Sequence, residues 1–102
     1  AAEDLFHEAD IAFHQALAAA TGNRALAVLA ERIHAALLVA RYPLARPQHR
    51  VERALPEHRR ILAAVEAHDA EEARAAMRDH LDTAAKYLRE GTRRARRRTV
   101  AA

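Results

Sequence analysis

Four polar side chains occupy positions where the helical spacing of the chain predicts apolar residues. Asp10 and His14 are four residues apart, so on a helix they lie one turn above each other on the same face. His58 and His80 are each eleven residues from residue 69, the centre of a predicted turn. Antiparallel pairing of the helices that flank this turn sets both imidazole rings at one height. The sequence therefore predicts a cluster of one carboxylate and three imidazoles on inward faces.

A divalent metal ion explains this cluster best. Burying such groups without partners costs on the order of several kcal/mol each, whereas neutral imidazole and carboxylate are natural ligands of a divalent ion. One Asp and three His suit zinc above all, with nickel or manganese also possible, and leave one or two positions for water or a ligand carboxylate. The alternative is that each histidine is a core residue bonded to a backbone carbonyl. Four such groups in this register favour the metal site.

Two further side chains are candidates for contacting an anionic ligand. Arg32 and His34 lie about level with the cluster if the chain makes a tight hairpin at Gly22. At that height the charge of Arg32 can meet a carboxylate. The alternative is that Arg32 is a surface residue. We keep both residues as expected effector contacts.

Two helices, over about residues 4–20 and 24–41, are predicted to position the first half of the cluster. Gly22 is expected to end the first helix as its C′ residue, and Asn23 to cap the second. The inward stripe of the first helix is predicted to be Phe6, Asp10, Phe13 and Leu17. The inward stripe of the second is predicted to be Leu26, Leu29, Ile33, Leu37 and Ala40.

Three prolines mark the expected breaks in the helical pattern. Pro43 and Pro47 are predicted to end the second helix and to force an irregular link. Pro56 falls inside the stripe of the third helix, where it is either the first residue of the helix proper or the site of a kink. We expect a break at Pro56, with a short helical piece before it.

The last two helices are predicted to form a second hairpin. Asp69 is placed to cap the fourth helix, with Glu72 at its N3 position, and that helix is expected to run to about Arg94. The inward residues of the third helix are predicted to be Val51, Leu55, His58, Ile61 or Leu62, and Val65. Those of the fourth are predicted to be Ala73, Met77, His80, Leu81, Ala84 and Leu88. The fold class is an all-α, antiparallel bundle of about four helices.

Length and composition restrict the class of protein. The chain has 102 residues, 28 of them alanine, and no cysteine, so we expect one domain without a disulfide or a thiolate site. Its apolar runs are far shorter than the roughly 20 residues of a membrane span, and no leader pattern opens it. A soluble, cytoplasmic protein is expected.

The net charge of +3 is unevenly placed. Five arginines fall within the last ten residues, and without them the rest of the chain carries −2. We divide the chain into a helical domain over residues 1–92 and a basic C-terminal tail over residues 93–102. Nucleic-acid binding by this chain would rest on the tail alone. The favoured interpretation of the tail is a solvated helix end, whose arginines suit the negative end of the helix dipole.

An enzyme is the weaker hypothesis. A di-iron bundle needs two Glu-x-x-His motifs, and only Glu31 and His34 match one. A zinc-protease motif is missing, and two glycines are too few for a phosphate-binding loop. A metalloenzyme with an open metal position, and a structural metal-binding interaction module, remain as alternatives.

Several blocks of the chain, from residue 3 to about residue 90, resemble a known family. They are Asp10-Ile-Ala-Phe13-His14, Thr21-Gly22-Asn23-Arg-Ala-Leu26, Glu57-His58-Arg-Arg-Ile61-Leu62-Ala-Ala-Val65, and Met77-Arg78-Asp79-His80-Leu81. The chain is similar there to the FCD effector-binding domain of FadR-type GntR transcriptional regulators. The resemblance implies that Asp10, His14, His58 and His80 bind a metal.

The same resemblance implies a function. Such a domain is an antiparallel helical bundle that binds a small organic acid beside its metal, and it acts in a homodimer. Operator DNA is bound by a preceding winged-helix domain, so we expect that this chain by itself does not bind an operator. The family also has one or two helices before the Asp10 block, so the chain is expected to be a C-terminal fragment. An apolar patch should then be exposed, or covered by a second copy.

Overall fold

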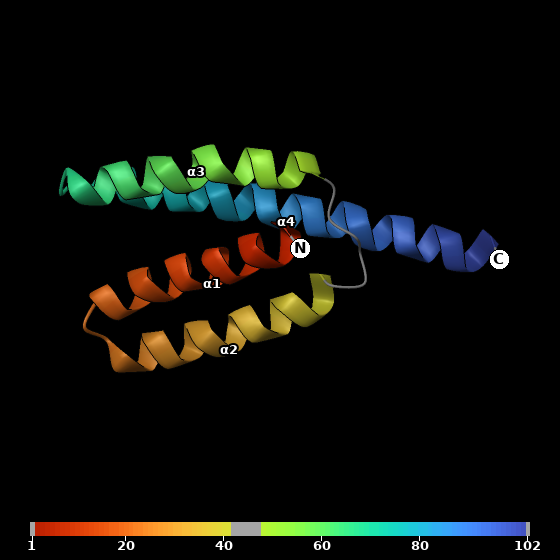
Figure 1. Ribbon diagram of the computed structural model, residues 1–102, viewed down its shortest axis with the longest axis horizontal. Helices are drawn as coiled ribbons and strands as arrows, with labels where there is room; N and C mark the ends of the chain where they lie inside the picture. Colours follow the sequence, from red (N-terminus) through yellow and green to blue (C-terminus); the bar gives the residue numbers. More distant parts are fainter. Residues whose placement is uncertain (1, 42–47, 102) are drawn as a thin grey trace. The chain divides into compact units, whose positions relative to one another are not determined.

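The structure, a computed structural model, describes the backbone of residues 2–41 and 48–101 and the side chains of residues 5–36, 52–94 and 96–100. It contains the helices α1 (Ala2–Ala20), α2 (Arg24–Arg41), α3 (Gln48–Glu66) and α4 (Ala70–Ala101), drawn in Figure 1. Within these ranges no residue is in a strand, so the predicted all-α fold class is confirmed. None of the described helices is both long and apolar enough to cross a membrane. The chain divides into two compact units, residues 1–46 and 47–102, and each is described by itself.

The first unit is an antiparallel hairpin in which α1 packs against α2 (Figure 1). Its turn has the predicted residues in the predicted roles. Gly22 takes a left-handed backbone with φ 73°, which glycine adopts without steric cost. Thr21 Oγ1 donates to the Ala18 carbonyl at 2.6 Å, and Asn23 Oδ1 accepts from the Leu26 N–H at 3.0 Å. The first bond closes the end of α1 and the second caps α2.

The inward face of α1 agrees with the prediction, and that of α2 does not. The predicted α1 stripe is half-buried along its length. On α2, however, Leu26, Leu29 and Ile33 are 43, 56 and 48 % exposed. Among the α2 side chains that the structure describes, those up to residue 36, the half-buried ones are instead Ala27, Ala30 and His34. Alanine lets two helices approach closely, so the small-residue face of α2 packs against α1 and the leucines turn outward. The side chains of Leu37 and Ala40, and the link with Pro43 and Pro47, lie outside what the structure describes.

The second unit is an antiparallel hairpin of α3 and α4. Its turn centres on His68, whose φ of 56° is left-handed, and the Asp69 N–H donates to the Ala64 carbonyl at 2.9 Å. Asp69 caps α4 as predicted, because its Oδ1 accepts from the Glu72 N–H at 3.0 Å. The Glu72 side chain binds Arg60 of α3, so this carboxylate links the two helices.

The expected break at Pro56 is wrong, because α3 is one continuous helix from Gln48 to Glu66. Proline cannot donate the hydrogen bond that the fourth preceding carbonyl would accept, which weakens a helix interior. Ala54 before Pro56 and Ile61 after it are nevertheless both buried. Packing on both sides of the proline therefore holds the helix together across it.

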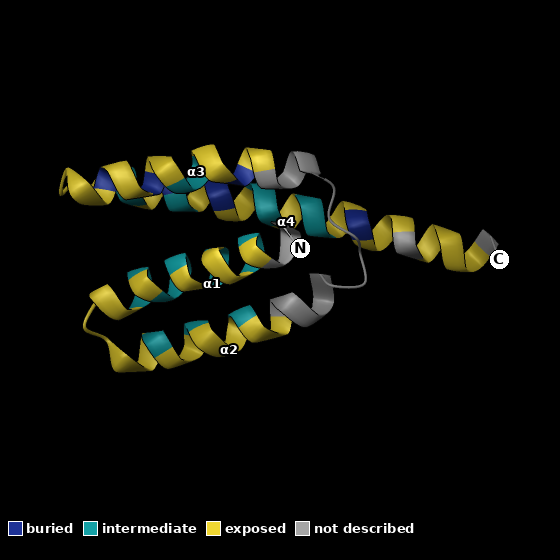
Figure 2. Ribbon diagram, in the orientation of Figure 1, coloured by how far each residue is buried: buried dark blue, intermediate teal, exposed yellow. Residues whose placement is uncertain are grey.

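Buried positions of the second unit lie on both α3 and α4 (Figure 2), and most of them carry small side chains. Among the residues with described side chains, the buried apolar ones are Ala54, Ile61, Ala64 and Ala76. Of the two alternatives at one position, Ile61 is 2 % exposed and Leu62 is 44 % exposed. Several predicted inward residues are exposed instead, namely Leu55, Val65 and Leu81. The faces through which α3 and α4 pack are therefore centred on the alanines and not on the leucines that we predicted to point inward.

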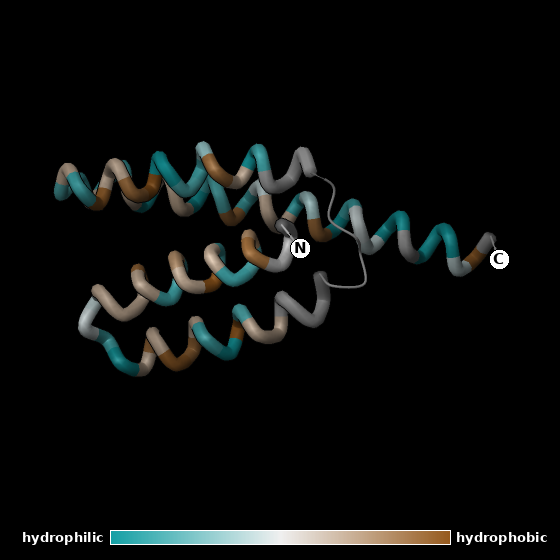
Figure 3. Tube along the Cα trace, in the orientation of Figure 1, coloured by the Kyte–Doolittle hydropathy of each residue, from teal (hydrophilic) through white to brown (hydrophobic). Residues whose placement is uncertain are grey.

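The fourth helix is longer than predicted. It continues past Arg94 to Ala101, so the segment assigned to a basic tail is helical throughout its described part. The arginines from Arg93 to Arg98 are exposed, and Figure 3 shows this end of α4 as a hydrophilic stretch. Arginine is a good helix former, and positive charge near a helix C-terminus interacts favourably with the helix dipole. Both effects favour continuation of the helix.

Candidate metal centre

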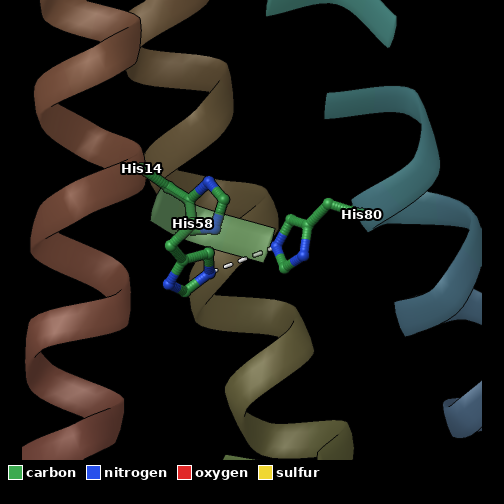
Figure 4. A group of neighbouring side chains, drawn as sticks. All are labelled: His14, His58 and His80. Atoms are coloured by element: carbon green, nitrogen blue, oxygen red, sulfur yellow. Dashed lines mark hydrogen bonds between the residues drawn. The ribbon is translucent and has the colours of Figure 1, made fainter. Parts of the chain in front are cut away.

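The second hairpin brings two predicted metal ligands together. His58 lies on α3 and His80 on α4, and their rings face each other with Nε2 atoms 3.3 Å apart (Figure 4). His80 is buried, with an exposed fraction of 5 %, and His58 is half-buried. The prediction that antiparallel pairing sets these two rings at one height is confirmed.

The distance between these two nitrogens fits a shared metal ion. Two nitrogens bound at about 2.0–2.1 Å to a tetrahedral ion are about 3.3–3.4 Å apart. A usual N–H hydrogen bond is shorter, at about 2.9–3.0 Å. The separation of 3.3 Å between His58 and His80 is thus the edge length of a tetrahedral zinc site.

Glu57 belongs to this group, which sequence reasoning did not predict. Glu57 Oε1 lies 2.6 Å from His80 Nδ1. The signal was present in the spacing, because Ala54, Glu57, Ile61 and Ala64 recur at intervals of three or four. Centring the inward stripe of α3 on the alanines, rather than on Leu55 and Leu62, would have placed Glu57 toward α4.

The first hairpin holds the other two predicted ligands. On α1, His14 Nε2 lies 3.2 Å from Asp10 Oδ1, as expected of side chains one turn apart. Both side chains are largely buried, at 11 % and 14 % exposed. Their nitrogen and oxygen are also separated by the edge length of a tetrahedral site, given metal–oxygen and metal–nitrogen distances of about 2.0–2.2 Å.

His34 of α2 joins this pair. Its ring centroid lies 5.4 Å from that of His14, and the side chain is half-buried, as the expected tight turn at Gly22 requires. The ring of Phe13 also lies against that of His14, with ring centroids 5.3 Å apart. Arg32 is exposed. The structure therefore brings His34, but not Arg32, beside the predicted ligands of this hairpin.

The donor set suits a borderline first-row ion. Imidazole nitrogen is a ligand for zinc, nickel and other transition ions, and a carboxylate accompanies it in many such sites. Each hairpin has a pair of ligand atoms at a separation that one ion can bridge. The residues present therefore fit a divalent metal, and the fit follows from both pairs independently.

One of three comparisons with known proteins gave a match. A family model described as the FCD domain matches residues 1–83, which include Asp10, His14, His58 and His80. Comparisons with curated proteins and with solved structures gave no match. The matched span is well over half of the chain and extends from α1 into α4. The chain belongs to the FCD domain family, the regulatory effector-binding domains of GntR-family transcription regulators.

Proposed function

We propose that this chain senses a small organic acid beside a divalent metal held by Asp10, His14, His58 and His80. The observation that carries the proposal is the 3.3 Å separation between Nε2 of His58 and Nε2 of the buried His80. Zinc is the favoured ion, with nickel and manganese as alternatives. All four residues lie within the span that the FCD domain model matches, which supports the ligand set that the resemblance implies.

The metal is proposed to take one pair of ligands from each hairpin. His14, His58 and His80 can each offer one imidazole nitrogen to an ion, and Asp10 adds a carboxylate oxygen. Four protein ligands neutralise only part of the charge of a divalent ion, because only one of them is anionic. An ion that expands its coordination beyond these four ligands would attract an anionic oxygen, so a carboxylate or an α-hydroxy acid is the expected effector.

His34 and Arg32 are the proposed protein contacts of the effector. His34 is packed beside His14, so a ligand held at the metal would lie within reach of its ring. Arg32 is two residues away on the same helix and carries the positive charge that a carboxylate pairs with. Its exposed side chain would have to turn toward the ligand for this contact.

The proposed output is a change in helix packing. A metal bound by both hairpins makes their arrangement depend on the contents of the site. An effector that binds one arrangement better than another shifts the population toward it. In the proposed regulator, a homodimer in the cytoplasm, this shift is transmitted to a winged-helix domain that binds operator DNA.

The metal content of the purified chain tests this function. About one equivalent of zinc, nickel or manganese is expected by elemental analysis after desalting without chelator. The His58→Ala variant should lose the bound metal, because one of its four proposed ligands is removed. His68→Ala is the matched control, since His68 is exposed in the turn between α3 and α4. Equal metal content in wild type and His58→Ala would contradict the assignment.

Effector binding is tested on the metal-loaded chain. A panel of small carboxylic and α-hydroxy acids is titrated by calorimetry, and at least one is expected to bind with the metal present and to lose most of its affinity without it. NMR of the recovered acid separates sensing from catalysis, because a sensor returns the acid unchanged. A chemically altered acid would favour a metalloenzyme instead.

A further inference from the structure

We propose that Glu57 is a positioning residue that holds His80 in the tautomer and ring orientation required for metal binding through Nε2. This inference rests on the proposed metal site and adds to it a residue that is not one of the four ligands. The juxtaposition that carries it lies wholly within the hairpin of α3 and α4.

The contact between Glu57 and His80 is short and sheltered. Glu57 Oε1 lies 2.6 Å from His80 Nδ1, the side chain of His80 is 6 % exposed, and that of Glu57 is 22 % exposed. A charge-assisted hydrogen bond of this length is strong, and burial of the ring limits competition by water. The bond therefore defines the environment of His80 Nδ1.

The chemistry of the two groups decides which ring nitrogen carries the proton. A carboxylate can only accept hydrogen bonds, so His80 Nδ1 must be the donor. A neutral imidazole protonated at Nδ1 has its lone pair at Nε2. That Nε2 is the atom that faces Nε2 of His58 at 3.3 Å. Glu57 thus leaves the lone pair of His80 at the atom that would bind the ion.

In this arrangement the adjacent residues Glu57 and His58 of α3 have different roles in the proposed metal site. His58 supplies a ligand to the site, and Glu57 reaches across to orient the ligand on α4. Metal-bound histidines commonly donate their second N–H to a carboxylate, which fixes the ring and strengthens its ligating nitrogen. Loss of such a partner typically weakens metal binding about 10- to 100-fold.

The tautomer of His80 is the first readout, and it requires no metal. Long-range 15N–1H NMR of the metal-free chain should show wild-type His80 protonated at Nδ1. Glu57→Ala should shift it toward protonation at Nε2, since the acceptor is removed. Glu57→Gln should keep the wild-type tautomer, because the amide oxygen still accepts from Nδ1–H. Finding wild-type His80 protonated at Nε2 would overturn the proposal.

The second readout is zinc affinity, measured by competition with a chromophoric chelator. Glu57→Ala is expected to weaken binding about 10- to 100-fold, and Glu57→Gln to recover part of the loss. Glu52→Ala removes an exposed carboxylate from the same helix and should leave both readouts unchanged. Circular dichroism verifies that each variant is helical, and Glu57→Gln decides the question if Glu57→Ala does not fold.

The results of these experiments distinguish failure of the Glu57 proposal from failure of the proposed metal-dependent function. Zinc affinity of Glu57→Ala and Glu57→Gln equal to that of wild type would overturn the role of Glu57 and leave the metal site standing. A wild-type chain that binds no metal would refute the proposed function. It would also refute the positioning role toward an ion, although the NMR measurement would still report the Glu57–His80 bond.

Discussion

Arg60 joins the two helices of the second hairpin through two carboxylates of α4. Its Nε and Nη2 donate to Glu72 at 3.1 and 3.0 Å, and its Nη1 donates to Asp79 at 2.7 Å. Donation first to Glu72 and then to Asp79 raises the pKa of the Arg60 guanidinium above its ordinary value. The hydrogen bond from Arg60 lowers the pKa of the Glu72 carboxyl. These groups are solvated, so water and salt screen the interaction.

The lowered pKa of Glu72 leads to a pH-dependent prediction. A carboxyl whose pKa is lower in the folded chain stabilises it above the ordinary glutamate pKa, and the effect is lost as the pH falls through the lowered pKa. Glu72→Gln should therefore cause a small decrease in Tm at neutral pH, with the two melting curves converging in acid. Thermal melts over a pH series measure this difference. Glu71→Gln is the control, because Glu71 pairs with Arg74 on its own helix. A difference that grows toward low pH would contradict the prediction.

At the scale of the helix, Pro56 is the main local conflict in the second hairpin. It occupies the interior of α3 and cannot donate a backbone hydrogen bond there. The helix persists because Ala54, Ile61 and Ala64 are buried on both sides of it. Tertiary packing thus overrides a local preference that, taken alone, predicts a break.

Replacing this proline measures the size of the conflict. Pro56→Ala should raise the free energy of unfolding by about 1–3 kcal/mol, because proline in a helix interior is about 3 kcal/mol less favourable than alanine. Chemical denaturation followed by circular dichroism gives the value. Arg59→Ala, also exposed on α3, should stay within about 0.5 kcal/mol of wild type. No gain from Pro56→Ala would indicate that the proline begins the helix proper, where it is tolerated.

At the scale of the whole chain, the proposed ion would add stability that the small apolar cores of the hairpins do not provide. The buried side chains among the described residues are those of three alanines, one isoleucine and His80, so little apolar surface is removed from water. A metal that takes ligands from both hairpins would couple their unfolding. Binding to the folded chain alone raises stability by mass action.

Zinc should therefore stabilise the chain by a calculable amount. At a free zinc concentration 100 times Kd, the free energy of unfolding should rise by about 2.7 kcal/mol. Denaturant titrations with and without zinc measure this rise, and chelator should reverse it. Magnesium is the control ion, since it prefers oxygen ligands to imidazole. His80→Ala should abolish the effect, and an equal gain in that variant would mean that zinc acts elsewhere.

Features that depend on neighbouring residues were predicted correctly from the sequence. Gly22 and Asn23 end one helix and begin the next through bonds that span at most four residues, and Asp69 caps α4 in the same way. The equal height of His58 and His80 needed one further fact, the position of the turn between them. The helix ends at these two turns, and the pairing of His58 with His80, therefore followed from short-range chemistry and the regular rise of the helix.

The faces of the helices were predicted less well. We chose stripes that favour large apolar residues, and the structure packs the alanines inward while Leu26, Leu29 and Leu55 remain exposed. Hydropathy ranks leucine above alanine, but close approach of two helices depends on side-chain volume, which is known only once the partner helix is placed. The same rotation concealed Glu57, whose contact with His80 depends on which side of α3 meets α4.

The sequence by itself thus determined the all-α class, the caps and turns, and the polar residues that demand a partner, because each of these follows from local geometry and the cost of burying polar groups. Tertiary structure alone decided that α3 continues through Pro56, that alanine faces form the contacts, and that Glu57 binds His80. Those outcomes depend on the total packing energy between two helices. That energy cannot be evaluated from either helix alone.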